Sequence, residues 1–401
     1  MRTSSVMRSA FFLVYISAGA LSAQDQVNEA PSLASGFSGG TSFSSLVSAS
    51  GKNDKGLELT LGLSSLYDSN LTQLPDGGES DLILTPEIAA EYELGNSRWN
   101  LGARGKFSYD SYDERDDFSD SNYLLDFYGG YQSRKLDASF TTGISSTSGF
   151  NRLAAGFIEQ SSFKSSLEAS YRFSRKTSLN ANWDQRLTES QTEGYGDTSS
   201  GTAAFSALWE ATPLIRIGPG FRYGIRTGND DEEFTVVGPT LRLNYKLSTK
   251  VKLHSTIGID YSDSPYSGED TLLNWSLGLS YRASSLWGFD LESIQDTRAT
   301  LSTGGGFDEV SSFRFNYWRK IRRARVELGL SYEDRTATDS QLSLTVPRDL
   351  EYLTLSAAMS LPVFRERADL KIHVKWRDQN EARDDSSWDG VQTGLSLSWK
   401  F

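Results

Sequence analysis

The sequence predicts an all-β fold, a transmembrane antiparallel β-barrel of about 18 strands. Three observations support this prediction. Apolar and polar residues alternate over segments of about 10 to 15 residues from Gly56 onward, which is the signature of long strands. Short and long connections alternate between these segments. Tyr and Trp recur beside the short connections, where a membrane barrel carries an aromatic girdle.

Composition favours long strands and excludes several other classes. Aromatic residues make up 12% of the 401 residues, whereas there are only 9 Pro, and Pro interrupts strands while aromatics favour them. Mean hydropathy is −0.44, because a barrel alternates lipid-facing and lumen-facing residues. A net charge of −12 excludes a nucleic-acid partner, which needs a basic surface. The absence of Cys excludes disulfides and thiolate chemistry.

The N-terminal 23 residues are predicted to be a secretory signal peptide. Arg2 and Arg8 give the positive charge, residues 10–21 form a short apolar segment, and cleavage is expected after Ala23. An uncleaved anchor is disfavoured because about a dozen apolar residues are too few to span a bilayer as a helix. Export of this kind is consistent with the bacterial outer membrane as the location.

Residues 24–55 are rich in Ser, Gly and Ala, and we predict a flexible periplasmic tail there, with a loosely held plug as the alternative. Residues 56–401 form the predicted barrel. Its first strand alternates Leu57 and Leu59 with Glu58 and Thr60. The last strand ends in a pattern that resembles the signal by which outer-membrane barrels address their assembly machinery: Leu395, Leu397, Trp399 and Phe401.

The connections predict the topology. Short turns are expected at 95–97, 133–135, 174–176, 211–213, 248–250, 284–285, 320–322 and 364–366. Longer polar loops are expected at 72–78, 113–120, 148–159, 191–197, 228–232, 264–269, 302–306, 336–348 and 379–387. Barrels of this class keep short turns in the periplasm and long loops outside, with an even number of strands. Aromatic residues flank the short turns: Tyr92, Trp99, Tyr131, Tyr171, Tyr245, Tyr281, Trp287 and Tyr317.

A motif near the start of the barrel resembles a known family. Tyr67-Asp68-Ser69-Asn70, followed by Ser80-Asp81 and Thr85-Pro86, is similar to the beginning of the β-barrel porin 2 family. The motif residues are Tyr67, Asp68, Asn70 and Asp81. The resemblance implies an outer-membrane barrel associated with exopolysaccharide biosynthesis and export, with polysaccharide export proteins as partners. It implies no catalytic residues.

Asp68, Asn70 and Asp81 are placed at the outer ends of the first two strands, facing each other across the first long loop. We interpret them as turn residues whose side chains bind their own backbone. A cation site is the alternative.

Strand parity points charged rows into the lumen. The predicted pore-lining residues are Arg216, Arg222, Arg226, Arg242, Lys371, His373, Lys375, Arg377, Asp290, Glu292, Glu87 and Glu91. Separated basic and acidic rows would set a transverse field across a water-filled pore. Alternatively, opposed rows neutralise one another and brace the wall.

Catalysis, cofactors and bound metals are not expected. The two histidines, His254 and His373, lie about six strands apart in the predicted barrel, too far for a nucleophile–base pair in hydrogen-bond contact. We found no phosphate-binding loop and no metal-ligand cluster.

Three functions remain. The first is a conduit for extracellular polysaccharide or other solutes. The second is a general diffusion porin with a loop folded inward, at 148–159 (carrying Phe150, Leu153 and Phe157) or at 336–348. The third is a structural or adhesive barrel. All three place the chain among outer-membrane lipids and lipopolysaccharide, delivered by the barrel-assembly machinery. The acidic outer loops are interpreted as solvated tips, with divalent ions bridging to lipopolysaccharide as the alternative.

Overall fold

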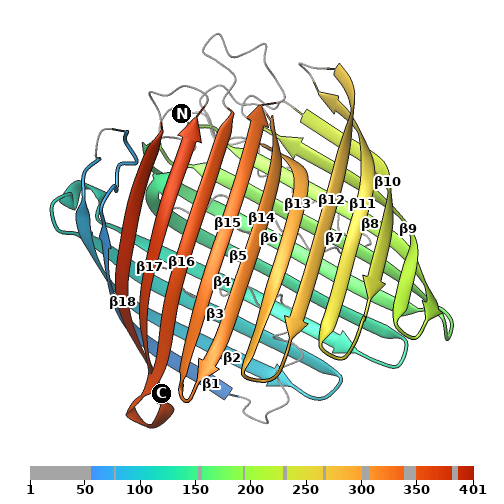
Figure 1. Ribbon diagram of the computed structural model, residues 1–401, viewed down its shortest axis with the longest axis horizontal. Coiled ribbons are helices and arrows are strands. Elements are labelled where there is room, and N and C mark those ends of the chain that lie inside the picture. The colour runs from blue at the N-terminus through green and yellow to red at the C-terminus, as the bar shows by residue number, and fades with distance from the viewer. Residues whose placement is uncertain are drawn as a thin grey trace, which may run out of the picture.

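The chain folds into one closed, antiparallel sheet of 18 strands (Figure 1). The computed structural model describes residues 56–401 except 76–77, 152–155, 193–194, 229–232, 265–267, 300–306, 338–348 and 382–386. Each strand pairs with its neighbours in the sequence, and the last strand pairs with the first to close the barrel. The predicted fold and strand number are therefore confirmed. The proposed signal peptide and tail lie outside the described residues.

The strands are 13 to 17 residues long. This exceeds the ~9–11 residues that a tilted strand needs to cross the apolar part of a bilayer. They are β1 (Gly56–Asp68), β2 (Asp81–Gly95), β3 (Trp99–Tyr112), β4 (Asp120–Gln132), β5 (Leu136–Asn151), β6 (Gly156–Arg172), β7 (Thr177–Ser190), β8 (Thr198–Thr212), β9 (Ile215–Thr227), β10 (Glu233–Tyr245), β11 (Val251–Ser264), β12 (Gly268–Arg282), β13 (Trp287–Ala299), β14 (Phe307–Ile321), β15 (Ala324–Ala337), β16 (Leu350–Val363), β17 (Ala368–Glu381) and β18 (Trp388–Lys400).

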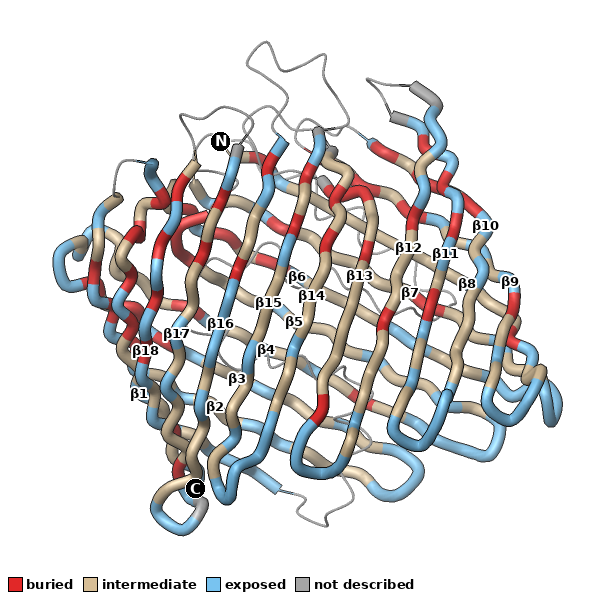
Figure 2. The backbone as a smooth tube through the Cα atoms, viewed as in Figure 1, coloured by how far each residue is buried: buried red, intermediate tan, exposed pale blue. Residues whose placement is uncertain are grey.

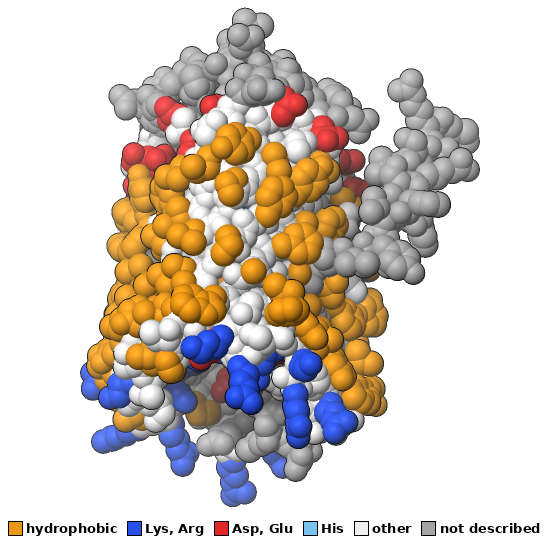
Figure 3. Space-filling model, turned by 90° about the vertical axis from the view of Figure 1, so that its right-hand side faces the viewer, with side chains coloured by type: hydrophobic (Ala, Val, Ile, Leu, Met, Phe, Trp, Pro, Cys, Tyr) orange, Lys and Arg blue, Asp and Glu red, His pale blue; other side chains and the backbone are white. Residues whose placement is uncertain are grey.

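The outer wall carries an apolar belt (Figure 3), and exposed aromatic rings lie near both of its ends. Leu61, Ile88 and Leu273 are among the exposed apolar side chains of this belt. Exposed rings at the short-turn end include Tyr92, Trp99, Tyr131, Tyr171 and Trp287, as predicted. A second group lies near the long-loop end: Tyr67, Tyr109, Tyr123, Tyr223, Tyr261 and Tyr332. A belt of this kind between two girdles is stable in lipid and not in water, so we describe the barrel as membrane-spanning.

Short turns and long loops occupy opposite ends of the barrel (Figure 1). The eight predicted short turns are confirmed, and one of them contains the 3-10 turn η6 (Phe364–Glu366). A second such turn, η4 (Asp116–Phe118), lies in the loop between β3 and β4. In the described part of the chain, no helix has the length and apolarity to cross a membrane.

One predicted loop is wrong. Residues 148–159 were expected to form a long polar connection, but β5 continues to Asn151 and β6 begins at Gly156, with Ser148 paired to Glu159. Apolar Phe150 and Phe157 pack with neighbouring side chains, which stabilises the extended hairpin. The predicted loops at 228–232, 302–306 and 336–348 fall wholly or largely outside the described residues, and so does Leu153. The loops at 264–269 and 379–387 were predicted too long, because Ser264 pairs with Gly268 and β17 continues to Glu381.

The barrel is not round. Cα atoms of β13 lie within 8 Å of Cα atoms of β8 and β9, although β10, β11 and β12 separate β9 from β13 in the sheet. Strands β9 and β13 therefore face each other at close range, and the sheet turns sharply through β10, β11 and β12 between them. Gly-Pro pairs stand where it turns, Gly218-Pro219 in β9 and Gly238-Pro239 in β10. The ladder between β10 and β11 is interrupted at Gly238 and Pro239, as expected because proline has no backbone N–H to donate.

We predict that Gly238→Ala destabilises the barrel. A Cβ at this position would lie 1.8 Å from the backbone oxygen of Ile259, so one strand must move, at a cost of about 1–3 kcal/mol. Gly201→Ala is the control, because its Cβ would meet only Trp183 at 3.7 Å, and it should stay within about 0.5 kcal/mol. Urea unfolding of the refolded barrels measures both. Equal stability of the two variants would contradict the close approach.

Candidate constriction in the barrel lumen

Buried side chains of the lumen gather at the long-loop end of the barrel, whereas the short-turn end is more exposed (Figure 2). Three of the largest fully buried side chains are arginines, Arg226, Arg335 and Arg377. They lie near the long-loop ends of β9, β15 and β17. Buried guanidinium groups require carboxylate partners because desolvation of an unpaired charge is costly. Apart from Glu333, which lies on the same strand as Arg335, the partners come from other strands.

The first group joins the two walls that approach each other. Arg222 on β9 lies 3.4 Å from the carboxylate of Asp260 on β11 and 2.6 Å from that of Asp296 on β13. Arg226 lies 3.1 Å from the same oxygen of Asp296. We call these four residues the β9–β13 constriction. One carboxylate between two guanidinium groups holds β9 against β13 across the sharp turn of the sheet.

A second group extends the network along β13–β15. Arg335 donates through Nε to Glu333 at 2.7 Å and through Nη1 to Asp308 at 3.2 Å. Arg298 on β13 lies 3.8 Å from Glu333. The β13 strand thus carries Asp296 toward β9 and Arg298 toward β15. This network shares β13 with the constriction through Arg298.

The third group lies at the closure of the barrel. Asp68 is fully buried, and its Oδ1 accepts from Arg377 at 2.6 Å. Its Oδ2 accepts from Gln392 at 2.8 Å. The Arg377 guanidinium also stacks on Trp388, 5.3 Å from the ring centroid. One carboxylate therefore joins β1 to β17 and β18.

Three polar residues near the start of the barrel, Asp68, Asn70 and Asp81, organise the first two outer loops. The Oδ1 of Asp68 accepts from the backbone N–H of Asn70, and the Oδ1 of Asn70 accepts from Leu74. The Asp81 carboxylate accepts from the backbone N–H groups of Leu82, Asp113, Glu114 and Arg115. Turn chemistry is therefore confirmed, and it reaches further than predicted. The carboxylate that a cation would use at Asp68 already binds Arg377.

An apolar cluster covers the inner wall of β1–β6 at the same end. It consists of Leu66, Leu71, Ile83, Tyr112, Phe150, Phe118 and Phe157. Phe118 stacks on Phe157 at 4.7 Å and meets Phe150 edge-on at 5.0 Å. The Arg115 guanidinium lies 3.9 Å from the Phe118 centroid. Leu71 and Phe118 come from the first two long loops, so the cluster draws both loops onto the wall.

All four predicted pore-lining carboxylates have partners on other strands. Glu87 lies 2.6 Å from Lys106, and Glu91 accepts from the Tyr128 hydroxyl at 2.6 Å. Asp290 binds Arg282 at 2.9 Å, and Glu292 lies 3.9 Å from Arg314. On β9, Arg216 lies 3.7 Å from Glu210. Many of the charged residues in the predicted rows therefore have a partner on a nearby strand.

The remaining predicted residues lie apart from the constriction. Arg242 lies on β10, and Lys371, His373 and Lys375 follow one another on the inner face of β17. The His254 and His373 rings each cover a glycine of an adjacent strand, Gly278 and Gly394. Strands β11 and β17 are far apart in the sheet, so the histidines form no pair.

The C-terminal residues face outward. Leu395 and Leu397 are exposed on β18, and Trp399 packs against Phe364 and Phe401 with ring centroids 5.1 and 6.4 Å apart. Their role as an assembly signal stays a prediction.

Several solved structures are similar to this chain at low sequence identity and with TM-scores below 0.5. OccAB4 of Acinetobacter baumannii is 11% identical, covering 87% of this chain and 99% of its own, with a TM-score of 0.47. OpdK of Pseudomonas aeruginosa, solved with vanillate, is 11% identical over 86% and 98%, with a TM-score of 0.45. A bacterial polysaccharide outer membrane secretin is 11% identical over 87% and 100%, with a TM-score of 0.34. Likenesses this weak carry no information on cargo. No protein family and no curated protein matches the sequence.

Sequence reasoning missed several residues that narrow the lumen. Asp260 and Asp308 stand in alternating segments with no local sign that they meet an arginine of another strand. Phe118 lies in an acidic loop that we interpreted as a solvated tip. One signal was available: an aromatic residue within a charged loop has apolar surface to bury.

Proposed function

We propose that the protein is an outer-membrane channel, with extracellular polysaccharide as its cargo. The observation that carries the channel is a closed barrel of 18 strands whose inner face is polar and charged while its outer face is apolar. Barrels of 16–18 strands leave an aqueous lumen. The long-loop end faces the exterior and the short-turn end faces the periplasm, as is general for this class.

The narrow part of this channel lies at the outer end. The β9–β13 constriction, the Arg335 group and the apolar cluster all lie there. The short-turn end, where residues are less buried, forms the periplasmic mouth, which we call the vestibule.

Polysaccharide as cargo rests on the family resemblance and on aromatic rings turned inward. Tyr128 lies over Gly102 on the inner wall, and Tyr352 packs with Trp388 at 6.2 Å. Aromatic faces stack on sugars, and neighbouring hydroxyl and carboxylate groups bind sugar hydroxyls. Two further functions are outcomes of the test below: general diffusion of small solutes, and a structural barrel that conducts nothing.

Single-channel conductance of the refolded barrel in a planar bilayer tests the proposal. We expect a steady current in potassium chloride that oligosaccharides interrupt from the short-turn side. Conductance without interruption by any oligosaccharide would indicate a diffusion porin. No current from barrels shown to be folded by their electrophoretic shift on heating would contradict the channel itself.

A further inference from the structure

The two ends of the barrel carry opposite charge (Figure 3). Exposed basic residues occupy the short turns: Arg98, Arg134, Lys135, Arg175, Lys176, Lys246, Lys250, Arg322, Arg323, Arg365 and Arg367. Exposed acidic residues stand in the first two long loops, among them Glu79, Asp113 and Asp117. This axial separation is distinct from the paired rows inside the wall. It occurs in a chain whose net charge is −12, so the basic end is a local feature.

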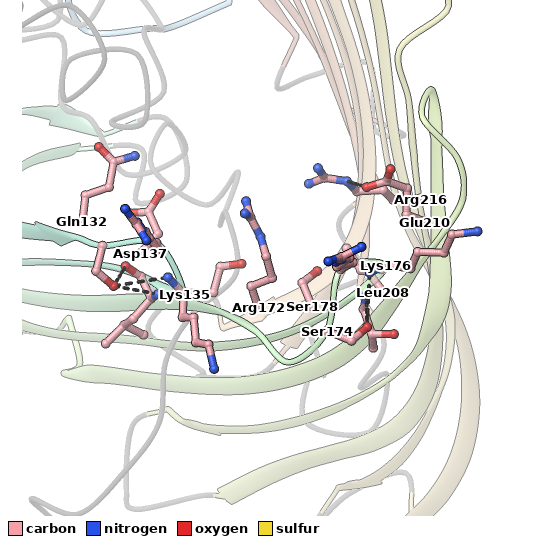
Figure 4. Close-up of a pocket in the computed structure, with 16 residues that line it drawn as sticks. Gln132, Lys135, Asp137, Arg172, Ser174, Lys176, Ser178, Leu208, Glu210 and Arg216 are labelled. Carbon is pink, nitrogen blue, oxygen red and sulfur yellow. Dashed lines mark hydrogen bonds and ion pairs between the residues drawn. The ribbon is translucent and has the colours of Figure 1, made fainter.

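A pocket at the basic end opens on the lumen side of β4–β9 (Figure 4). It lies between the β4–β5 turn, the β6–β7 turn and the start of β9. Arg172 follows outward-facing Tyr171, and Arg216 pairs with Glu210 beside outward-facing Trp209, so both arginines point inward. Figure 4 shows both extending into the same space. The pocket is therefore in the path of a chain entering the vestibule.

The pocket has an excess of positive charge. Its basic residues are Arg134, Lys135, Arg172, Arg175, Lys176 and Arg216, and its acidic residues are Asp137 and Glu210. Glu210 lies 3.7 Å from Arg216, which neutralises one of the six. Ser170, Ser178 and Gln132 add hydrogen-bonding groups. Several cations beside hydroxyl and amide groups suit carboxylates on a polyhydroxylated chain.

We propose that this pocket is the entry site for an acidic glycan, and that it binds uronic carboxylates of the chain as it enters the lumen. This inference rests on the proposed function and specifies its substrate class. A folded acidic protein would reach only the turn tips, whereas an extended glycan can reach Arg172 and Arg216 on the inner wall. Forked guanidinium groups recognise carboxylates in two-point contacts, which lysine alone cannot supply.

Binding of a fluorescent oligogalacturonate to the refolded barrel, followed by polarisation, tests the site without depending on conductance. A neutral malto-oligosaccharide of equal length is the reference ligand. The test variant is Arg172→Gln with Arg216→Gln. Its control is Arg319→Gln with Lys320→Gln, which removes the same charge from exposed residues at the short-turn end of β14. All barrels are checked for folding by their electrophoretic shift.

We expect the acidic oligomer to bind and the neutral one not to bind at the same concentration. The test variant should raise the dissociation constant about tenfold or more, equivalent to ~1.4 kcal/mol, and the control less than about twofold. Equal weakening by the two variants would mean that only the overall rim charge acts, and would overturn the site. Equal binding of both ligands would overturn acidic specificity. Loss of conductance with binding preserved would contradict the channel and not the pocket.

Discussion

Asp68→Ala is expected to lower the free energy of unfolding by about 3–5 kcal/mol, because it leaves a buried guanidinium without its carboxylate. Arg377 and Asp68 are 2% and 0% exposed and lie 2.6 Å apart. The same substitution also removes the acceptor of Gln392 and of the Asn70 backbone. Since the carboxylate joins β1 to β17 and β18, its loss weakens the closure of the sheet. Urea unfolding in detergent micelles, followed by tryptophan fluorescence, gives the value.

A second ion pair at the same closure supplies the matched control. Lys400 on β18 lies 3.2 Å from Glu58 on β1, and both side chains are about half exposed. Glu58→Ala should therefore change stability by less than about 1 kcal/mol. Asp68→Asn separates charge from hydrogen bonding, because it keeps one acceptor oxygen, and it should fall between wild type and Asp68→Ala. Similar losses for Asp68→Ala and Glu58→Ala would show that burial of the Asp68 pair has no energetic consequence.

The barrel could be predicted from the sequence because its determinants are local. Alternation of Leu57, Leu59 and Leu61 with polar residues fixes which face meets lipid. A turn such as 133–135 fixes which strands pair, since a short connection leaves only the antiparallel neighbour within reach. Repeating these two rules around the chain gives the strand number and closure. Neither rule depends on contacts between distant strands.

The cross-section could not be predicted, because it depends on pairs that cross the lumen. Parity places Arg222 and Asp296 inside but does not say that β9 approaches β13. The interpretation of Asp68 shows the same limit. Its bond to Asn70 follows from the local sequence, whereas its bond to Arg377 joins residues 309 positions apart. Gly218-Pro219 and Gly238-Pro239 are sequence marks of the sharp turn, and they are recognisable as such once the flattened shape is known.

Pairing decides between the two interpretations of the charged rows at the constriction. Arg222 lies 2.6–3.4 Å from two carboxylates in a partly buried site. At that separation the paired charges attract each other far more strongly than either attracts an ion at the far wall of the lumen. Arg222 and Arg226 therefore serve first as a brace. At the opposite end of the barrel, around Arg172 and Arg216, basic residues outnumber acidic residues. The vestibule, and not the constriction, is where net charge acts on cargo.

Asp296→Ala is expected to have the other large effect, a loss of about 3–5 kcal/mol together with a change of ion selectivity. Asp296 is the carboxylate between Arg222 and Arg226, and without it two guanidinium groups repel each other in the narrow part of the lumen. Asp260 remains 3.4 Å from Arg222 and compensates one of them. The reversal potential in a salt gradient should shift toward anions, and urea unfolding gives the stability.

A combined variant separates the brace from its charges. Arg222→Met, Arg226→Met and Asp296→Leu, with Asp260→Asn, remove the whole network but keep similar volume. Replacing a complete buried ion network by apolar residues is neutral or stabilising, so this variant should lie within about 1 kcal/mol of wild type or above it. The anion preference of Asp296→Ala should disappear as well. A combined variant as unstable as Asp296→Ala would mean that the ion pairs themselves, rather than the burial of unpaired charge, hold β9 against β13.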